Sequence, residues 1–269
     1  MIMKQNNFSI ACRYAREWQS NKGAILAHYT TFEAAVKILS SKSLRFGRLS
    51  GMNDINESYR AIWYPHDTTD PDRYKSAVYT YRQISLTLDK KQQRCFNIHP
   101  MWGHYAQKGA GVCIVLDKHI IEQRAKTMNC RYGNVSYRKS SDSTVVFDAK
   151  NPETDIAKHY RAIFYRKSKA WGYEQEYRII KKCGEGNEDV FLDISEAIKA
   201  IILCNGDAKD LSQRVFCTPM FCFLRNLFGD KYPIFAYEHF GGDELLVCQE
   251  IHTVWTNGPL ASGQYEIDV

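Results

Sequence analysis

Two glutamates, Glu174 and Glu176, stand two residues apart, just before the apolar pair Ile179-Ile180. If the strand that these isoleucines mark begins by Glu174, its period of two places both carboxylates on one face. Two carboxylates on one face repel each other, which costs stability unless a cation or a ligand hydroxyl lies between them. Arg178, on the same face, offers a structural explanation, a Glu-Arg ladder along an exposed strand. The functional explanation is a carboxylate that holds a sugar hydroxyl.

A second group of polar side chains, His28-Tyr29-Thr30, stands between a predicted strand and a predicted helix. The apolar run of residues 25–27 predicts a buried strand, and the helical apolar period after it predicts a helix with one face on the core. Thr30 and Glu33 have the spacing of a capping box at the helix start. Ligand sites are frequent at such junctions in layered folds. The alternative is structural, with His28 capping the helix and Tyr29 in the core.

Arg45 and Arg48 lie on either side of Gly47 in an alternating segment, 44–49, that predicts a half-buried strand, and Asn53-Asp54 follow in a predicted turn. A cation next to a glycine can hold a pyrophosphate, and the polar pair can hold hydroxyls. The structural alternative is a surface strand that is closed by an Asx turn.

Two further pairs of residues share a face of a predicted element. Ser85 and Thr87 alternate with apolar neighbours, which places both on one face of a strand. Trp102 and Tyr105 are three residues apart on a predicted helix and therefore share its face. An aromatic pair of this kind can line a planar pocket for a nicotinamide or adenine ring, or it can belong to the core.

The composition of the 269-residue chain limits its class. Its hydrophobic content of 44% is enough for one large core or two modest ones. The apolar runs are far shorter than the roughly 20 residues that cross a bilayer, and the polar N-terminus lacks the apolar core of a secretion signal. We therefore expect a globular protein of the cytoplasm. The nine cysteines include no CxxC pair, so we expect reduced thiols and no metal site.

The order of strand and helix patterns predicts one α+β domain, with at most a subdomain division near residue 190. The expected strands include residues 84–87, 112–116, 190–192, 198–204, 234–237 and 245–248. The expected helices include residues 70–82, a helix that opens at His99-Pro100 in a segment ended by Gly109 and Gly111, and residues 155–169 and 207–228, the last interrupted near Pro219.

The net charge of +6 permits nucleic acid as a partner without requiring it. Basic and aromatic residues interleave at 131–132, 137–139 and 160–167, which could hold phosphates and stack on unpaired bases. The structural alternative for each stretch is a solvated face whose aromatic side chains point inward.

Four blocks of the chain together resemble a bacterial family long left without an assigned function. They are HYT at 28–30, the segment 44–54 ending in Asn53-Asp54, MWGHYA at 101–106, and WGYEQEYR at 171–178. The resemblance covers about residues 25–205, and the chain departs from it at Ile55, where Pro is usual. The opening block is also similar to that of ADP-ribosyltransferases, in which a strand-end His, a Tyr and a later Glu surround NAD. It looks most like the nucleic-acid-modifying toxins of toxin-antitoxin systems, including phage-defence toxins that act on mRNA.

This resemblance implies a single ADP-ribosyltransferase-like domain over residues 1–269, with a split mixed β-sheet flanked by helices. Its core would span about residues 25–205, and a C-terminal α/β extension would span about residues 206–269. The implied function is an NAD-dependent mono-ADP-ribosyltransferase toxin of anti-phage defence, without a metal, that modifies nucleic acid, RNA in preference to DNA. The implied protein partner is an antitoxin, with or without a chaperone, and no membrane is involved.

The resemblance also implies roles for individual residues. Glu176 would hold the ribose 2′-hydroxyl and stabilise the oxocarbenium-like state of glycosidic cleavage, with Glu174 as the near alternative that orients the acceptor. His28 would hydrogen-bond the adenosine-side ribose, Tyr29 would pack on nicotinamide, and Arg45 would pair with the pyrophosphate. The other residues of the expected NAD site are Thr30, Asn53, Asp54, Ser85, Thr87, Trp102 and Tyr105.

Two other functions stay open from the sequence. One is a nucleic-acid-binding or sensing module of a defence system, without catalysis, in which Glu174 and Glu176 are structural. The other is a metal-dependent nuclease that uses those glutamates together with Asp54.

Overall fold

The computed structural model describes residues 23–51, 71–90, 93–138, 151–184, 186, 188–204, 219–229, 231–240, 243–248 and 251–256, with the backbone alone from residue 238 onward. The chain divides into two compact units, each assembled from separate segments. The first unit comprises Met1–Lys42, Thr87–Ile121 and Ile194–Val269, and the second comprises Ser43–Leu86 and Glu122–Asp193. Both units contain helices and strands, which confirms the predicted α+β class.

The first unit is built on a mixed sheet. Its strands are β1 (Ile25–Thr30), β5 (Val112–Asp117), β11 (Ile198–Cys204), β12 (Ile234–Phe240), β13 (Asp243–Cys248) and β14 (Ile251–Thr256). They lie in the order β14, β13, β12, β11, β5, β1. The β11–β12 pair is parallel and the other pairs are antiparallel, so the expected mixed sheet is confirmed. At the end of the order, β1 also pairs with the last two residues of β4 (Tyr81–Leu88).

The centre of this sheet follows directly from the apolar runs of the sequence. β5 pairs with β1 on one side and with β11 on the other. Its residues from Val112 to Leu116 are all fully buried. A continuous apolar run is the pattern of a strand that is covered on both faces. The helices of the unit are α2 (Phe32–Ser41), α5 (His99–Tyr105) and α8 (Pro219–Phe228), with a short 3-10 turn, η2 (Gln107–Gly109), after α5.

The N-terminus of α2 differs from the prediction by one residue. Thr31 is the cap, because its hydroxyl accepts the N–H of Ala34 at 3.2 Å. The capping box predicted from Thr30 and Glu33 is therefore wrong. Thr30 is the last residue of β1 and pairs with Val112, so its extended backbone belongs to the sheet.

Gly111 lies where β5 begins, close to the end of β1. A Cβ atom on Gly111 would lie 2.3 Å from the carbonyl oxygen of Thr30 and 2.7 Å from the Cα of Ala106. Both distances are far below a van der Waals contact, so the position has room for glycine alone. A Cβ on Gly103, within α5, would meet nothing within 4 Å.

The second unit contains shorter elements. Its strands are β2 (Ser43–Arg45), β3 (Gly47–Arg48), most of β4, β6 (Arg131–Asn134), β7 (Ser136–Arg138), β8 (Arg166–Ser168), β9 (Glu176–Lys182) and β10 (Phe191–Asp193). Its helices are η1 (Leu49–Gly51), α4 (Pro71–Tyr79), α7 (Pro152–Phe164) and η3 (Lys169–Glu174), and α6 (Lys118–Thr127) contains residues of both units. The sheet order is β3, β4, β9, β6, while β2 pairs with β10 and β7 pairs in parallel with β8.

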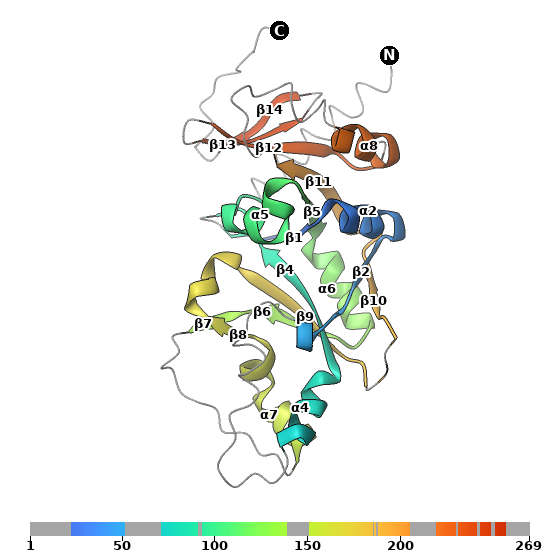
Figure 1. The fold of residues 1–269 in the computed structure, drawn as a ribbon, viewed down its shortest axis with the longest axis vertical. Helices are drawn as coiled ribbons and strands as arrows, with labels where there is room; N and C mark the ends of the chain where they lie inside the picture. The colour runs from blue at the N-terminus through green and yellow to red at the C-terminus, as the bar shows by residue number, and fades with distance from the viewer. Residues whose placement is uncertain are drawn as a thin grey trace. The chain divides into compact units, whose positions relative to one another are not determined.

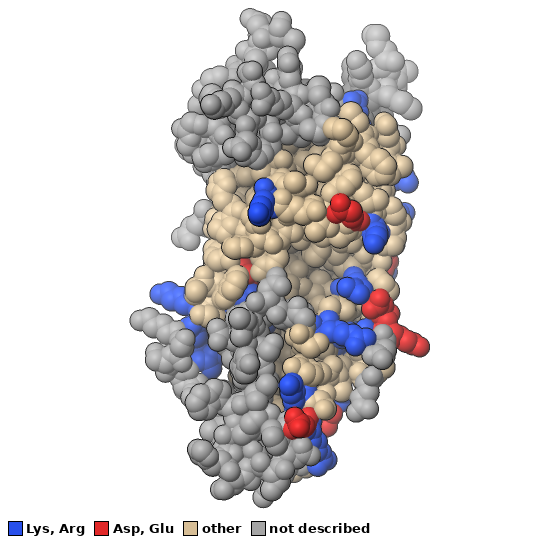
Figure 2. Space-filling view, viewed as in Figure 1, with Lys and Arg blue, Asp and Glu red and all other residues tan. Residues whose placement is uncertain are grey.

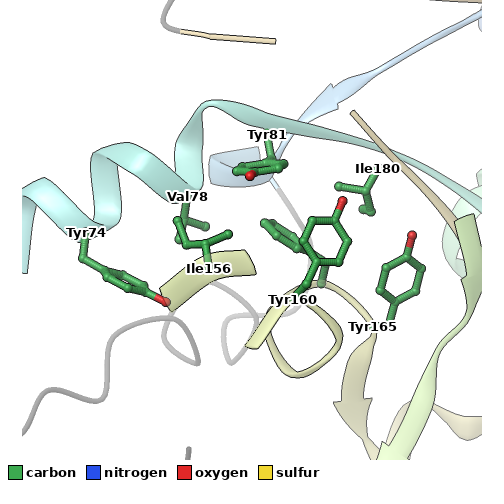
Figure 3. Packing of buried hydrophobic residues seen from close by; sticks show 8 residues of the cluster. Tyr74, Val78, Tyr81, Ile156, Tyr160, Tyr165 and Ile180 are labelled. Atoms are coloured by element: carbon green, nitrogen blue, oxygen red, sulfur yellow. The ribbon is translucent and has the colours of Figure 1, made fainter. Parts of the chain in front are cut away.

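The core of the second unit lies between α4, α7 and the sheet (Figure 1). Figure 3 shows Val78 of α4 against Ile156 of α7, with Tyr81 of β4 near Tyr160. The ring centroids of Tyr81 and Tyr160 are 6.0 Å apart. Ile156, Tyr160 and Phe164 of α7 are buried in this core, and Ile163 is partly buried against it.

Two predicted helices end earlier than their patterns indicated. The helix predicted to reach residue 82 ends at Tyr79, and β4 starts at Tyr81. The helix predicted to reach residue 169 ends at Phe164, and residues 166–168 form β8. In both places, pairing with a neighbouring strand overrides a local helical pattern. Of the segment predicted as a helix over 207–228, the structure describes residues 219–228, which are helical.

Candidate functional site

The predicted site residues are divided between the two units. Those of the first unit are His28, Tyr29, Thr30, Thr87, Trp102 and Tyr105. Those of the second unit are Arg45, Ser85, Glu174 and Glu176. Asn53 and Asp54 lie outside the described residues.

Tyr29 and Trp102 are core residues of the first unit. The Tyr29 hydroxyl donates to the carbonyl oxygen of Cys95 at 2.8 Å and accepts the N–H of Ile98 at 3.4 Å. The indole N–H of Trp102 donates to the carbonyl oxygen of Phe96 at 2.9 Å. The two rings meet edge to face at 5.1 Å, and burial raises the pKa of the Tyr29 hydroxyl well above its ordinary value. Their polar atoms therefore fix the backbone of residues 95–98, as the core alternative expects.

A third aromatic residue completes this cluster, which we call the aromatic core: Tyr29, Trp102 and Tyr237. Trp102 stacks on Tyr237 with the centroids 5.8 Å apart and the planes 3° from parallel. Thr87 is also buried, at 1% exposure. His28, Thr30 and Tyr105 are half-buried, so these three predicted residues of the first unit retain contact with solvent.

The two glutamates are not on one strand. β9 begins at Glu176, whereas Glu174 is the last residue of η3, so the prediction that a strand carries both is wrong. Gln175 between them has the left-handed backbone, with φ 49° and ψ 41°, which ends η3 and leads the chain into β9. Both glutamates are buried, at 3% and 6% exposure. The exposed Glu-Arg ladder is also wrong, because Arg178 is 2% exposed.

The cation between the two carboxylates is Lys167. Its Nζ lies 2.6 Å from Oε2 of Glu174 and 3.6 Å from Oε2 of Glu176. The ammonium also lies 4.7 Å from the centroid of the Trp171 ring. The sequence did not indicate this role for Lys167, because the helix predicted over residues 155–169 included it. The observed helix α7 ends at Phe164, and Lys167 lies in strand β8. The repulsion argument predicted either a cation or a ligand hydroxyl between the carboxylates, and the structure has a cation there.

Arg178 holds the carboxylate of Glu176 with two hydrogen bonds. Its Nε donates to Oε1 at 2.8 Å and its Nη2 donates to Oε2 at 2.7 Å. A two-bond pairing of guanidinium and carboxylate combines strength with a fixed geometry. The remaining Nη1 of Arg178 donates to the carbonyl oxygen of Phe164 at 2.7 Å. We call Lys167, Glu174, Glu176 and Arg178 the glutamate network.

A neutral side chain of β4 also donates to Glu176. The amide of Gln83 lies 3.4 Å from Oε1, and the Ser85 hydroxyl beside this amide helps to lower the pKa of the carboxyl group. Gln83 also donates to the Ser85 oxygen at 2.7 Å. A carboxylate has about four lone-pair positions, and Arg178 and Gln83 occupy three of those of Glu176. Ser85 itself is exposed, which places a hydroxyl on the surface beside the buried network.

The charge of Glu176 follows from these partners. Burial by itself raises the pKa of the carboxyl group, but the Arg178 guanidinium, the Lys167 ammonium and the Ser85 hydroxyl outweigh burial, and the net pKa is lowered. Glu176 is therefore ionised at neutral pH. It can act there as a fixed negative charge, but not as a general acid.

Arg45 pairs with Asp189 and not with a member of the glutamate network. Its guanidinium lies 3.5 Å from Asp189, and the two side chains are 63% and 49% exposed. Such an exposed pair is weak, so it leaves the guanidinium able to exchange Asp189 for an anionic ligand. Within the described residues, no group of three or more His, Cys, Asp or Glu side chains is placed to hold a metal ion.

Residues 101–179 match the model of a family described as "Protein of unknown function (DUF2971)". The matched segment runs from α5 into β9 and includes all four members of the glutamate network. No curated protein and no solved structure matches the chain. None of the helices in the described part of the chain combines the length and the apolar character that a membrane span needs.

Proposed function

We propose that this protein is an NAD-dependent mono-ADP-ribosyltransferase that transfers ADP-ribose to nucleic acid, RNA in preference to DNA, as a toxin of cytoplasmic anti-phage defence. The observation that carries the proposal is the ionised carboxylate of Glu176, fixed at the first residue of β9 and flanked by the exposed hydroxyl of Ser85. The resemblance of the four sequence blocks supports the choice of NAD as the donor.

The chemistry requires a negative charge near the ribose and little else. Cleavage of the nicotinamide–ribose bond passes through an oxocarbenium-like state, which a fixed carboxylate stabilises electrostatically. Because Arg178 and Lys167 hold Glu176 ionised and in place, the site needs no reorganisation when that positive charge develops. In this proposal Ser85 contacts the ribose, Glu174 orients the acceptor and Arg45 pairs with the pyrophosphate.

The first unit supports the proposal less. His28, Thr30 and Tyr105 are half-buried and can contact a ligand. Tyr29 and Trp102 have their polar atoms on backbone partners and their rings in the aromatic core. We therefore no longer assign nicotinamide stacking to Tyr29.

The acceptor is proposed from the resemblance and from the net charge of +6. On the face shown in Figure 2, the described Lys and Arg side chains occur in small groups with Asp and Glu among them. Of the basic-aromatic stretches, Arg131 and Tyr132 on β6 are exposed, whereas Tyr160 and Tyr165 are buried. Because the surface charge does not select one acceptor, the experiment must compare several. An antitoxin, with or without a chaperone, is the proposed protein partner.

The test is incubation of the purified protein with labelled NAD and, in separate samples, total RNA, single-stranded DNA and lysate protein. We expect label on RNA and release of nicotinamide. Glu176→Gln should lose both, and Ser85→Ala, which removes an exposed hydroxyl and should fold normally, should reduce both. The matched control is Glu153→Gln, which makes the same change at an exposed carboxylate on α7. No label on any acceptor and no nicotinamide release would refute the proposal.

One observation favours a second function, a nucleic-acid-binding module without catalysis. Arg178 and Gln83 donate to the carboxylate of Glu176, as expected for a group whose role is structural. Such a module would bind RNA with an affinity that falls steeply with salt concentration, and it would release no nicotinamide. The same set of samples therefore separates the two functions.

A further inference from the structure

Tyr137, which the sequence indicated only as part of the basic-aromatic stretch 137–139, lies next to the glutamate network. It is the middle residue of β7 and pairs with Lys167 of the parallel strand β8. Its ring lies beside Gly172 of η3, where a Cβ would be 3.9 Å from the ring. Its hydroxyl oxygen accepts the backbone N–H of Glu176 at 2.6 Å. The backbone of Glu176 is held on its other side by the N–H of Val135, which donates to the Glu176 carbonyl oxygen at 2.9 Å.

The Tyr137 hydroxyl has a hydrogen left to donate. A phenol both accepts and donates one hydrogen bond or more, and here the oxygen already accepts the N–H of Glu176. Among the residues that the structure describes, no acceptor takes the hydroxyl hydrogen. The side chain is half-buried, so a ligand can reach it. Its charged neighbours are Glu176, Glu174 and Arg178, and within the described residues no hydrogen bond joins the phenol to either carboxylate.

We infer that Tyr137 is a ligand-contacting residue, whose hydroxyl donates to a ribose hydroxyl of a nucleotide seated against Glu174 and Glu176. A ribose hydroxyl fits this position because it can accept from a phenol while it donates to a carboxylate. The bond from the Glu176 N–H fixes the phenol oxygen, so the donor is oriented before the ligand binds. This inference rests on the proposed function, since NAD supplies the ribose.

The protonation state suits a donor. Burial, the largest influence, raises the pKa of the Tyr137 hydroxyl, and the nearby charges of Glu176 and Glu174 raise it further. The hydroxyl therefore keeps its hydrogen throughout the physiological pH range.

The experiment compares wild type, Tyr137→Phe and protein with 3,5-difluorotyrosine at position 137, using nicotinamide release from NAD as the readout. Difluorotyrosine keeps the ring and the acceptor oxygen but makes the phenol more acidic. We expect Tyr137→Phe to lower kcat/KM by about tenfold or more. In the difluorotyrosine protein, activity should disappear at a lower alkaline pH than in wild type, because the donor loses its hydrogen earlier. Tyr132→Phe, which removes a hydroxyl from an exposed tyrosine of the same unit, is the matched control.

The outcomes that overturn the inference can be told apart. If Tyr137→Phe keeps kcat/KM within about twofold of wild type, Tyr137 does not contact the ligand. If Tyr137→Phe is inactive but the difluorotyrosine protein has the pH profile of wild type, Tyr137 only holds the backbone of Glu176. If the wild-type protein itself releases no nicotinamide, the proposed function is wrong, and the inference that depends on it is wrong as well. The wild-type sample alone therefore tests the proposed function, and the variants test the role of Tyr137.

Discussion

The aromatic core of the first unit and the glutamate network of the second unit both bury side chains that looked like ligand groups in the sequence. In the aromatic core, Tyr29 and Trp102 donate hydrogen bonds to backbone carbonyl oxygens, and both side chains are uncharged. In the glutamate network, Glu176 and Arg178 use theirs on each other, and both stay ionised.

The difference shows what each arrangement can do. Neutral polar atoms that bond the backbone stabilise a loop and leave little electrostatic field behind. A buried ion pair gains little net stability, because desolvation of the two charges offsets most of their attraction. What it does provide is a fixed arrangement of charges, which the proposed transferase would use to stabilise an oxocarbenium-like state. Burial alone therefore does not identify a structural residue in this protein.

The largest effect should follow from Arg178→Met. The substitution keeps an apolar side chain of similar length but leaves the carboxylate of Glu176 buried without its guanidinium. We expect a loss of about 3–5 kcal/mol in the free energy of unfolding, measured by urea denaturation. The control is Lys182→Met, which breaks the exposed pair with Glu153 and should cost about 1 kcal/mol or less. A loss as small as that of the control would show that the network is not tightly coupled to the fold.

An intermediate effect should follow from Tyr29→Phe in the aromatic core. The carbonyl oxygen of Cys95 would lose its donor in a buried site, at a cost of about 1–3 kcal/mol in the free energy of unfolding. Affinity for NAD should be unchanged. The control is Tyr79→Phe, at an exposed position of α4. Unchanged stability with a loss of NAD binding would instead make the aromatic core a ligand site and remove the contrast between the two regions.

The smallest effect should be a difference in pH dependence between the two regions. The native pKa of Glu176 is lowered, so its contribution to stability is complete above the unfolded pKa of about 4.3 and is lost as the pH falls through the native pKa. The difference in unfolding free energy between wild type and Glu176→Gln should therefore shrink as the pH falls below about 4. The difference between wild type and Tyr29→Phe should stay constant over the same range. Urea denaturation at a series of pH values measures both, and a constant Glu176→Gln difference would contradict the assigned charge.

Much of the first unit could be predicted from the sequence, because its central strands carry the apolar pattern of full burial. β5 and β11 are the clearest cases, and both lie where they were expected. The cap of α2 was missed by one residue, since adjacent threonines offer the same hydroxyl and only the pairing of Thr30 with β5 decides between them.

The glutamate network could be predicted only in part. The pair of carboxylates was visible, and so was the need for either a cation or a ligand hydroxyl between them. The identity of that cation depended on β8, a three-residue strand whose pairing with β7 no local pattern reveals. Tyr137 was missed for the same reason, because its contact with Glu176 joins residues from β7 and β9.

Gly103 within α5 and Gly111 after it should differ in their tolerance of substitution. A gene library randomised at codon 111 should return glycine alone, because any other side chain places a carbon on the carbonyl oxygen of Thr30. Codon 103 should accept alanine, which would even favour the helix by about 1 kcal/mol. A glycine kept at position 111 among relatives would thus record how closely β1 and β5 meet, whereas a glycine kept at position 103 would need a reason other than packing.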